Sequence, residues 1–112
     1  MSFQLRPVGP PGDSDGAEAV EIYGDVDATN SADLSNALRE LASPALIVDL
    51  SHVDYFDSAG FAMIDRLLGQ VPIALVISPG SVVRTAAELV DLPFHDSLTD
   101  ARVSMLARRT YG

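Results

Sequence analysis

Near the N-terminus, hydrophobic and polar residues alternate with the two-residue period of strands that are buried on one face. Two segments show this alternation, Ser2–Val8 and Ala19–Tyr23. A stretch rich in proline and glycine, at about residues 9–18, lies between them and predicts a flexible loop. The three segments together predict an antiparallel hairpin with a long tip.

Two later segments are almost continuously apolar, which is typical of strands buried on both faces of a parallel sheet. They are Ala45–Leu50 (ALIVDL) and Ile73–Ile77 (IALVI). A third segment, Pro93–His95, predicts a short last strand.

Four further segments carry apolar residues at the three- and four-residue spacing of an amphipathic helix. We expect the first of these helices to begin at Asn30, whose side chain together with Asp33 resembles a cap. We expect it to end at Ser43-Pro44. Ser97 predicts a capping box at the start of the last helix. The expected inward-facing residues are, in chain order, Leu34, Ala37, Leu38 and Leu41; Phe61, Ile64 and Leu68; Val82, Ala86 and Leu89; Leu98, Ala101 and Met105.

The alternation of strands and helices predicts one α/β domain over residues 1–112. The hairpin is followed by helices and strands in turn, so right-handed crossovers should build a mixed, mostly parallel sheet. A chain of 112 residues with 47% hydrophobic residues is long enough to bury one core.

The charge of the chain excludes several kinds of partner and site. Sixteen acidic residues face seven arginines and no lysine, for a net charge of −9. Such a field repels nucleic acid and anionic lipid, and no apolar run is long enough to cross a bilayer, so we expect neither nucleic-acid binding nor membrane insertion. A P-loop, a kinase and a Schiff-base enzyme each need a lysine. The absence of cysteine and of a signal peptide favours a cytoplasmic protein.

The stretch DYFDSAGF, residues 54–61, contains the main candidate for chemistry. Ser58 should stand at a helix N-terminus, where unpaired backbone N–H groups and the helix dipole stabilise an added anion. A phosphoryl group there would add about −1.5 to −2 charges, and Gly60 should leave the backbone beside it uncluttered. The simpler interpretation, that Asp57 and Ser58 only begin a helix, stays open at this point.

Four aspartates are expected around Ser58. Asp54 and Asp57 flank it in sequence, and Asp25 and Asp27 of the motif GDVD should approach the same edge of the sheet. Their spacing matches no loop motif for a cation, so we interpret them as an acidic rim and expect no metal site and no cofactor.

Other kinds of protein fit the motifs less well. A serine hydrolase needs G-x-S-x-G, but Phe56 takes the place of the first glycine. His52 and His95, the only histidines, are expected near strand ends. A two-component receiver needs a lysine, and a nucleotide-binding module needs a Gly-rich phosphate loop.

Three motifs in order, GDVD, DYFDSAGF and VISPGSVVRTAAELVDLPFHDSL, resemble the STAS family and, more narrowly, the anti-sigma factor antagonists. The resemblance runs from about Val20 to Leu106. It implies one mixed sheet with helices mainly on one face. It also implies a bacterial transcription regulator that is not an enzyme. In the family, the partner is both an anti-sigma factor and a serine kinase, and it binds the unphosphorylated antagonist. The complex separates when the partner phosphorylates the motif serine of the antagonist. A phosphatase then removes the phosphate.

Carried over by motif position, the resemblance makes Ser58 the phosphorylated residue. Asp27 and Asp57 would line it, and Gly60 matches the motif glycine, whereas Ala59 stands where many members carry a second serine. The resemblance also allows an unmodified STAS scaffold, for example a transporter-associated subunit. The residues expected to contact the partner are Asp25, Asp54, Ala59, Phe61 and Met63.

Overall fold

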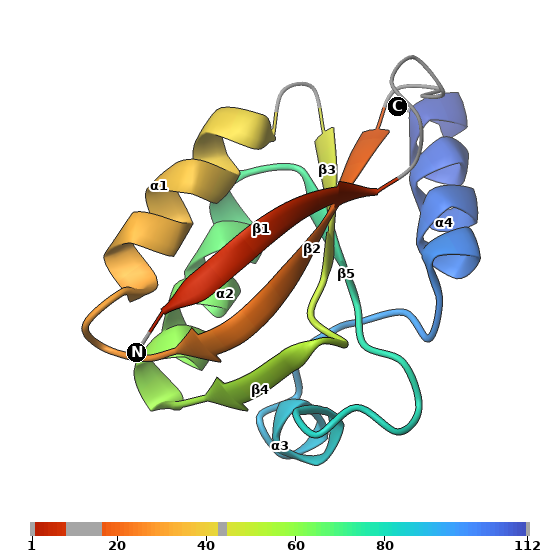
Figure 1. Ribbon diagram of the computed structural model, residues 1–112. Helices are drawn as coiled ribbons and strands as arrows, with labels where there is room; N and C mark the ends of the chain where they lie inside the picture. Colours follow the sequence, from red (N-terminus) through yellow and green to blue (C-terminus); the bar gives the residue numbers. More distant parts are fainter. Residues whose placement is uncertain (1, 9–16, 43–44, 112) are drawn as a thin grey trace.

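The computed structural model describes residues 2–8, 17–42 and 45–111 and contains a five-stranded mixed sheet with four helices (Figure 1). The strands are β1 (Phe3–Val8), β2 (Ala17–Val26), β3 (Ala45–Asp49), β4 (Val53–Phe56) and β5 (Ile73–Val76). The helices are α1 (Ser31–Leu41), α2 (Ser58–Gln70), α3 (Arg84–Leu89) and α4 (Leu98–Tyr111). The α/β class predicted from the sequence is confirmed.

β2 organises the sheet, because it pairs with three other strands. It is antiparallel to β1 and parallel to β3, and its last residues pair in parallel with β4, with a register shift between Gly24 and Asp25. β5 lies beside β3, so the main strand order is β1-β2-β3-β5. Gly24 has a φ of +99°, and a Cβ there would lie 2.5 Å from the carbonyl oxygen of Ser2, so the bend requires glycine. The predicted hairpin and both predicted parallel strands are thus confirmed.

The sequence prediction missed β4. In this strand only the two end residues, Val53 and Phe56, are buried, and the two between them are exposed, so neither alternation nor an apolar run marks it. Ser58 therefore follows β4 and not directly β3. The strand expected at Pro93–His95 is reduced to a single bridge between His95 and Val76.

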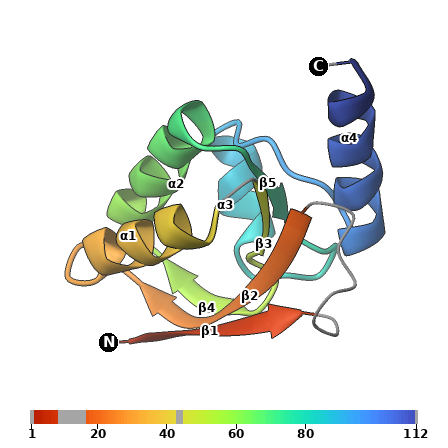
Figure 2. The ribbon, with the colours of Figure 1, turned by 90° about the horizontal axis from the view of Figure 1, so that it is seen from above.

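Helices cover both faces of the sheet, as the view from above shows (Figure 2). The larger hydrophobic cluster lies between the sheet and the helices α1 and α2, with α3 closing one end of it. A smaller cluster on the opposite face joins β3 and β5 to Ala101 and Met105 of α4. Alternate residues of β3 and β5 enter one cluster or the other: Val48 belongs to the first and Ile47 to the second.

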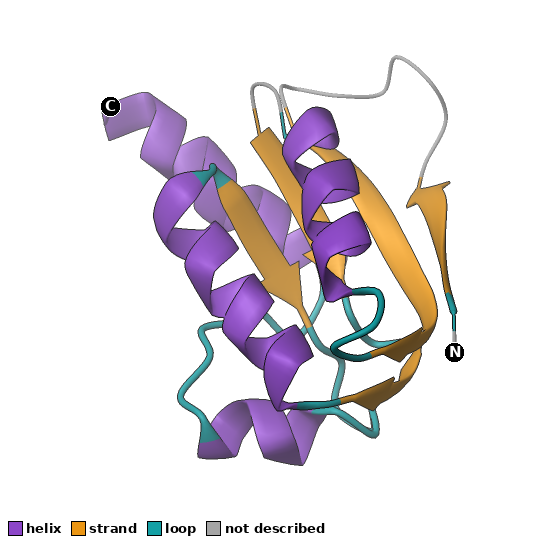
Figure 3. Ribbon diagram, turned by 90° about the vertical axis from the view of Figure 1, so that its left-hand side faces the viewer, coloured by secondary structure: helices purple, strands orange, loops and turns teal. Residues whose placement is uncertain are grey.

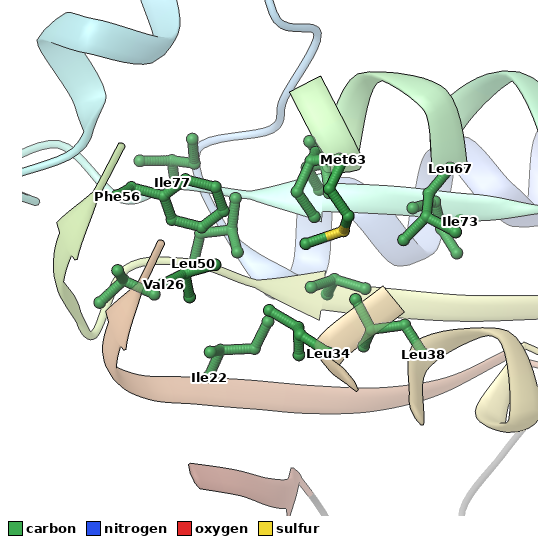
Figure 4. Packing of buried hydrophobic residues seen from close by; sticks show 14 of the residues in the cluster. Ile22, Val26, Leu34, Leu38, Leu50, Phe56, Met63, Leu67, Ile73 and Ile77 are labelled. Carbon is green, nitrogen blue, oxygen red and sulfur yellow. The ribbon is translucent and has the colours of Figure 1, made fainter. Parts of the chain in front are cut away.

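The larger cluster fills the space between α2, α1 and the strands with aliphatic side chains (Figure 4). Each fully buried aliphatic side chain contributes about 1.5–3 kcal/mol to folding. Labelled members in Figure 4 are Ile22, Val26, Leu34, Leu38, Leu50, Phe56, Met63, Leu67, Ile73 and Ile77.

The predicted caps have different outcomes in the structure. Ser97 Oγ accepts a hydrogen bond from Asp100 N at 3.1 Å, which confirms the cap at the start of α4. Asn30 stands at the start of α1, but its side chain makes no cap bond there. Its Oδ1 instead accepts from Asp27 N, and its Nδ2 donates to the carbonyl oxygen of Asp25, each at 2.9 Å. Asn30 therefore holds the turn before the helix.

The predicted inward face of the third helix is wrong. Val82 and Leu89 are 72% and 82% exposed, whereas Val83 and Ala87 are buried. The helix begins at Arg84, after a turn, so the residues that face the sheet are shifted by one from the expected set. In α1, Leu34 and Leu38 are buried as predicted, but Leu41 is 39% exposed.

Two predictions fall partly or wholly outside the residues that the structure describes. Residues 9–16 of the expected loop are among these, whereas Ala17 and Glu18 belong to β2. The expected helix end at Ser43-Pro44 also lies outside, and α1 ends at Leu41. Within the described residues, every helix is too short or too polar to cross a membrane.

Candidate functional site

Ser58 is the first residue of α2, and its side chain is exposed. The residue before it, Asp57, caps the helix: its Oδ1 accepts a hydrogen bond from Gly60 N at 3.0 Å. The Asp57 carbonyl accepts from Phe61 N, also at 3.0 Å. This cap holds the first turn of α2, which begins at Ser58, just after β4. The helices and strands of this region are seen from the side in Figure 3.

The turn between β2 and α1 lies against the start of α2. Asp57 Oδ2 accepts a hydrogen bond from Ala28 N at 3.3 Å, and Asp57 N donates to the carbonyl of Val26 at 3.1 Å. Parallel pairing of β2 with β4 brings the carboxyl ends of these strands together. The GDVD motif and the DSAG turn therefore meet at one edge of the sheet, as expected from the sequence.

Asp27 is buried, and its carboxylate is bound within its own turn. Oδ1 accepts hydrogen bonds from the backbone N–H of Thr29, at 2.8 Å, and from the Thr29 hydroxyl. The bond from the hydroxyl is the main cause that lowers the pKa of Asp27 below its usual value, although burial opposes it. Asp27 is therefore ionised at neutral pH. Its role toward Ser58 stays a prediction.

A hollow of about 400 Å³ opens beside Ser58, between α2 and the segment that follows α3. Its walls are mainly apolar, with one carboxylate, that of Asp65. The rings of Phe56 and Phe61 pack together in it, with centroids 4.8 Å apart. The lining residues are Phe56, Ser58, Phe61, Ala62, Asp65, Val90 and Leu92. The sequence did not indicate Val90 and Leu92, because only the fold brings the segment after α3 to this place.

Gly60 has a packing role that the sequence prediction did not include. A Cβ at this position would lie 2.6 Å from two ring carbons of Phe56 and 3.2 Å from Cγ1 of Val26. The ring of Phe56 thus packs directly against the backbone of α2, where only glycine fits.

The residues expected at a partner surface differ in their exposure. Asp54 is exposed, and Asp25, Ala59 and Phe61 are partly buried. Met63 is 3% exposed and belongs to the core, so its prediction as a partner contact is wrong (Figure 4). Because α2 begins at Ser58, its buried stripe runs through Gly60, Met63, Ile64 and Leu67.

A group of side chains that could bind a metal ion lies apart from the acidic rim. In the part of the chain that the structure describes, ligand atoms of Glu21, Asp49 and His52 form such a set, and those of Asp25, Asp27, Asp54 and Asp57 do not. No sequence spacing indicated this group, because its members come from two strands and a turn.

Comparison with known proteins identifies the family. A family model described as "Mlab, STAS domain" matches residues 12–92. The anti-sigma-F factor antagonist RsfB of Mycobacterium tuberculosis is 29% identical over 110 residues, covering 86% of this chain and 90% of RsfB.

Solved structures share the fold. An anti-sigma factor antagonist from Mycobacterium paratuberculosis superposes with a TM-score of 0.75 at 23% identity, over 92% of this chain and 93% of that chain. The anti-sigma factor antagonist SpoIIAA, in its unphosphorylated form, gives a TM-score of 0.60 at 13% identity, over 95% of this chain and 96% of that one. With a family model matched over most of its length and the same fold in these structures, the chain belongs to the STAS-domain family.

Proposed function

We propose that this chain is an anti-sigma factor antagonist, which binds an anti-sigma factor through the surface around Ser58. The observation that carries the proposal is the position of Ser58, exposed on the capped first turn of α2 and beside an apolar hollow. The relative RsfB and both structural neighbours are named as anti-sigma factor antagonists, which supports this role. The chain then acts in the cytoplasm as a regulator of transcription and not as an enzyme.

Phosphorylation of Ser58 is the proposed switch. The anti-sigma factor is also a serine kinase: it transfers the γ-phosphoryl group of ATP to the Ser58 oxygen, the hydroxyl proton leaves, and ADP is released. About two negative charges then enter a contact that had matched a neutral hydroxyl, which weakens the complex. Hydrolysis of the phosphoserine by a phosphatase restores binding. The neighbour SpoIIAA is described in its unphosphorylated form, which is consistent with a switch of this kind.

Because the surface around Ser58 is already acidic, phosphorylation should change mainly the binding of the partner and not the fold of this chain. Asp54 is exposed and Asp57 is partly buried beside Ser58, so a phosphate would add charge to a surface that is already negative. Such a phosphate gains little from this chain beyond the helix N-terminus, and its main effect falls on the complex. Asp57 presents Ser58 by holding the first turn, and Asp27 orders the neighbouring turn.

The test uses the wild type and three variants as baits in a lysate of the source organism, with mass spectrometry of the bound proteins. Wild type and Ser58→Ala should retain an anti-sigma factor, and Ser58→Asp should lose it. Thr99→Asp is the matched control, because it adds the same charge to the exposed first turn of α4, on the other face of the sheet. It should bind as the wild type does.

The captured anti-sigma factor is then incubated with ATP and the wild-type chain. Mass spectrometry should place one phosphate on Ser58, and none should form on Ser58→Ala. If Ser58→Asp binds the same proteins as the wild type and Ser58 stays unmodified, the chain is an unmodified STAS scaffold and the proposal is wrong.

A further inference from the structure

Outside the Ser58 region, one face of the sheet carries a group of polar side chains. Glu21 and Tyr23 of β2 point away from the larger cluster, since Ile22 between them points into it. Asp49 lies on the same face at the end of β3, and the β2–β3 register places it directly opposite Glu21. The turn that follows β3 adds His52.

Three of these side chains converge as metal ligands would. His52 Nε2 lies 3.2 Å from Glu21 Oε2. One ligand atom each from Glu21, Asp49 and His52 lie within 4.8 Å of one another. With metal–ligand bonds of about 2.0–2.2 Å, tetrahedral coordination puts neighbouring ligand atoms about 3.4 Å apart, a spacing close to the distance between His52 and Glu21.

Neighbouring groups hold each ligand in place. The Tyr23 hydroxyl donates to Glu21 Oε1 at 2.9 Å, which leaves Oε2 directed at His52. Ser51 N donates to Asp49 Oδ1 at 2.8 Å. The Tyr23 ring stacks on the His52 ring, with centroids 4.7 Å apart and planes 9° apart. Outer hydrogen bonds and packing of this kind orient the ligands in metal sites.

We propose that Glu21, Asp49 and His52 bind one divalent transition-metal ion, with Zn²⁺ the best match. Imidazole nitrogen and carboxylate oxygen are both ligands of this ion, and three protein ligands leave a fourth position for water. The site is open to water, since the side chains of His52 and Glu21 are 41% and 22% exposed. Mg²⁺ and Ca²⁺ prefer oxygen ligands only, so the imidazole selects against them.

The charge balance of the group favours a bound divalent ion over an ion pair between His52 and Glu21 alone. Two carboxylates face one imidazole, and a protonated imidazole neutralises only one of them, whereas a divalent ion neutralises both. Arg6 lies opposite Glu21 in the β1–β2 register, and its guanidinium packs on the Tyr23 ring, with the guanidinium carbon 5.0 Å from the ring centroid. The bound ion fastens the β3–β4 turn to β2, and β4 leads directly to the helix that carries Ser58.

The test is calorimetric titration of the full chain, without an affinity tag and stripped of metal, with ZnCl₂ and separately with MgCl₂. We expect one Zn²⁺ per chain with a dissociation constant of about 1–10 μM, and no measurable Mg²⁺ binding at the same concentrations. His52→Gln should weaken Zn²⁺ binding at least about tenfold, because it removes the nitrogen ligand. His95→Gln is the matched control and should bind as the wild type does.

Tyr23→Phe separates positioning from ligation. It keeps the ring over His52 and removes the hydroxyl that orients Glu21, so affinity should fall about tenfold while the fold is retained. In NMR spectra, Zn²⁺ should shift the imidazole signals of His52 and not those of His95. The absence of Zn²⁺ binding, or equal affinity in the wild type and His52→Gln, overturns the proposal.

Discussion

Single polar side chains hold the Ser58 region together by binding backbone groups across turns. Asp57 binds Gly60 N in its own helix and Ala28 N in the neighbouring turn. Asn30 binds Asp27 N and the carbonyl of Asp25. The sequence predicted Asn30 as the cap of α1. It could not predict which backbone groups its side chain binds, because this depends on the path of the turn before the helix.

Gly60→Ala tests how closely the Phe56 ring packs on α2. The added methyl would meet the ring at 2.6 Å, so the variant should lose about 1–3 kcal/mol of unfolding free energy. Gly69→Ala is the matched control in the same helix, since nothing lies within 4 Å of its Cβ. It should gain about 0.5 kcal/mol. Urea unfolding followed by circular dichroism measures both, and equal stability of the two variants would contradict this packing.

Among the elements, those with a helical period or an apolar run were predicted, whereas β4 and the inward face of α3 were not. Helix α2 was predicted as an element, although only Ile64 of its expected inward residues is buried and Phe61 and Leu68 are partly buried; β5 is buried throughout, as expected. In contrast, β4 has four residues and α3 has six, too few to establish a period. Both are held by tertiary contacts: β4 pairs with β2, and Val83, directly before α3, and Ala87 within it enter the core.

Substitutions of Asp57 test whether the cap defines the start of α2. Asp57→Ala removes the acceptor for Gly60 N and should cost about 1 kcal/mol of unfolding free energy. Asp57→Asn keeps an oxygen acceptor and should cost clearly less, because asparagine caps helices about as well as aspartate does. Thermal and urea unfolding measure both. An equal loss in the two variants would mean that the negative charge, and not the cap bond, stabilises this turn.

At the scale of the whole molecule, charge and shape act together. The chain carries a net charge of −9, and part of it gathers around Ser58 in Asp54, Asp57 and Asp65. Next to these carboxylates lie the hollow beside α2 and the 53% exposed side chain of Val90. A binding partner whose surface is basic, with an apolar centre, would complement these carboxylates and this hollow best.

Salt dependence of the association rate tests this electrostatic match for the proposed complex. Raising NaCl from about 0.05 to about 0.5 M shortens the screening length severalfold and should slow association about tenfold or more. The dissociation rate should change less, because short contacts are screened less. Stopped-flow or surface plasmon resonance with the captured anti-sigma factor measures both rates. An association rate that is independent of salt would exclude electrostatic steering.

By itself, the sequence determined the α/β class, the hairpin, the two buried parallel strands and the helix that begins at the DSAG turn. These features follow from local periodicity and turn residues, which act over a few positions and can be read along the chain. Tertiary structure decided the pairing of β4 with β2, the inward face of α3, the burial of Met63 and the hollow beside Ser58. It also decided the meeting of Glu21, Asp49 and His52. Each of these depends on strand register or on contacts between distant segments, and no local pattern in the chain encodes them.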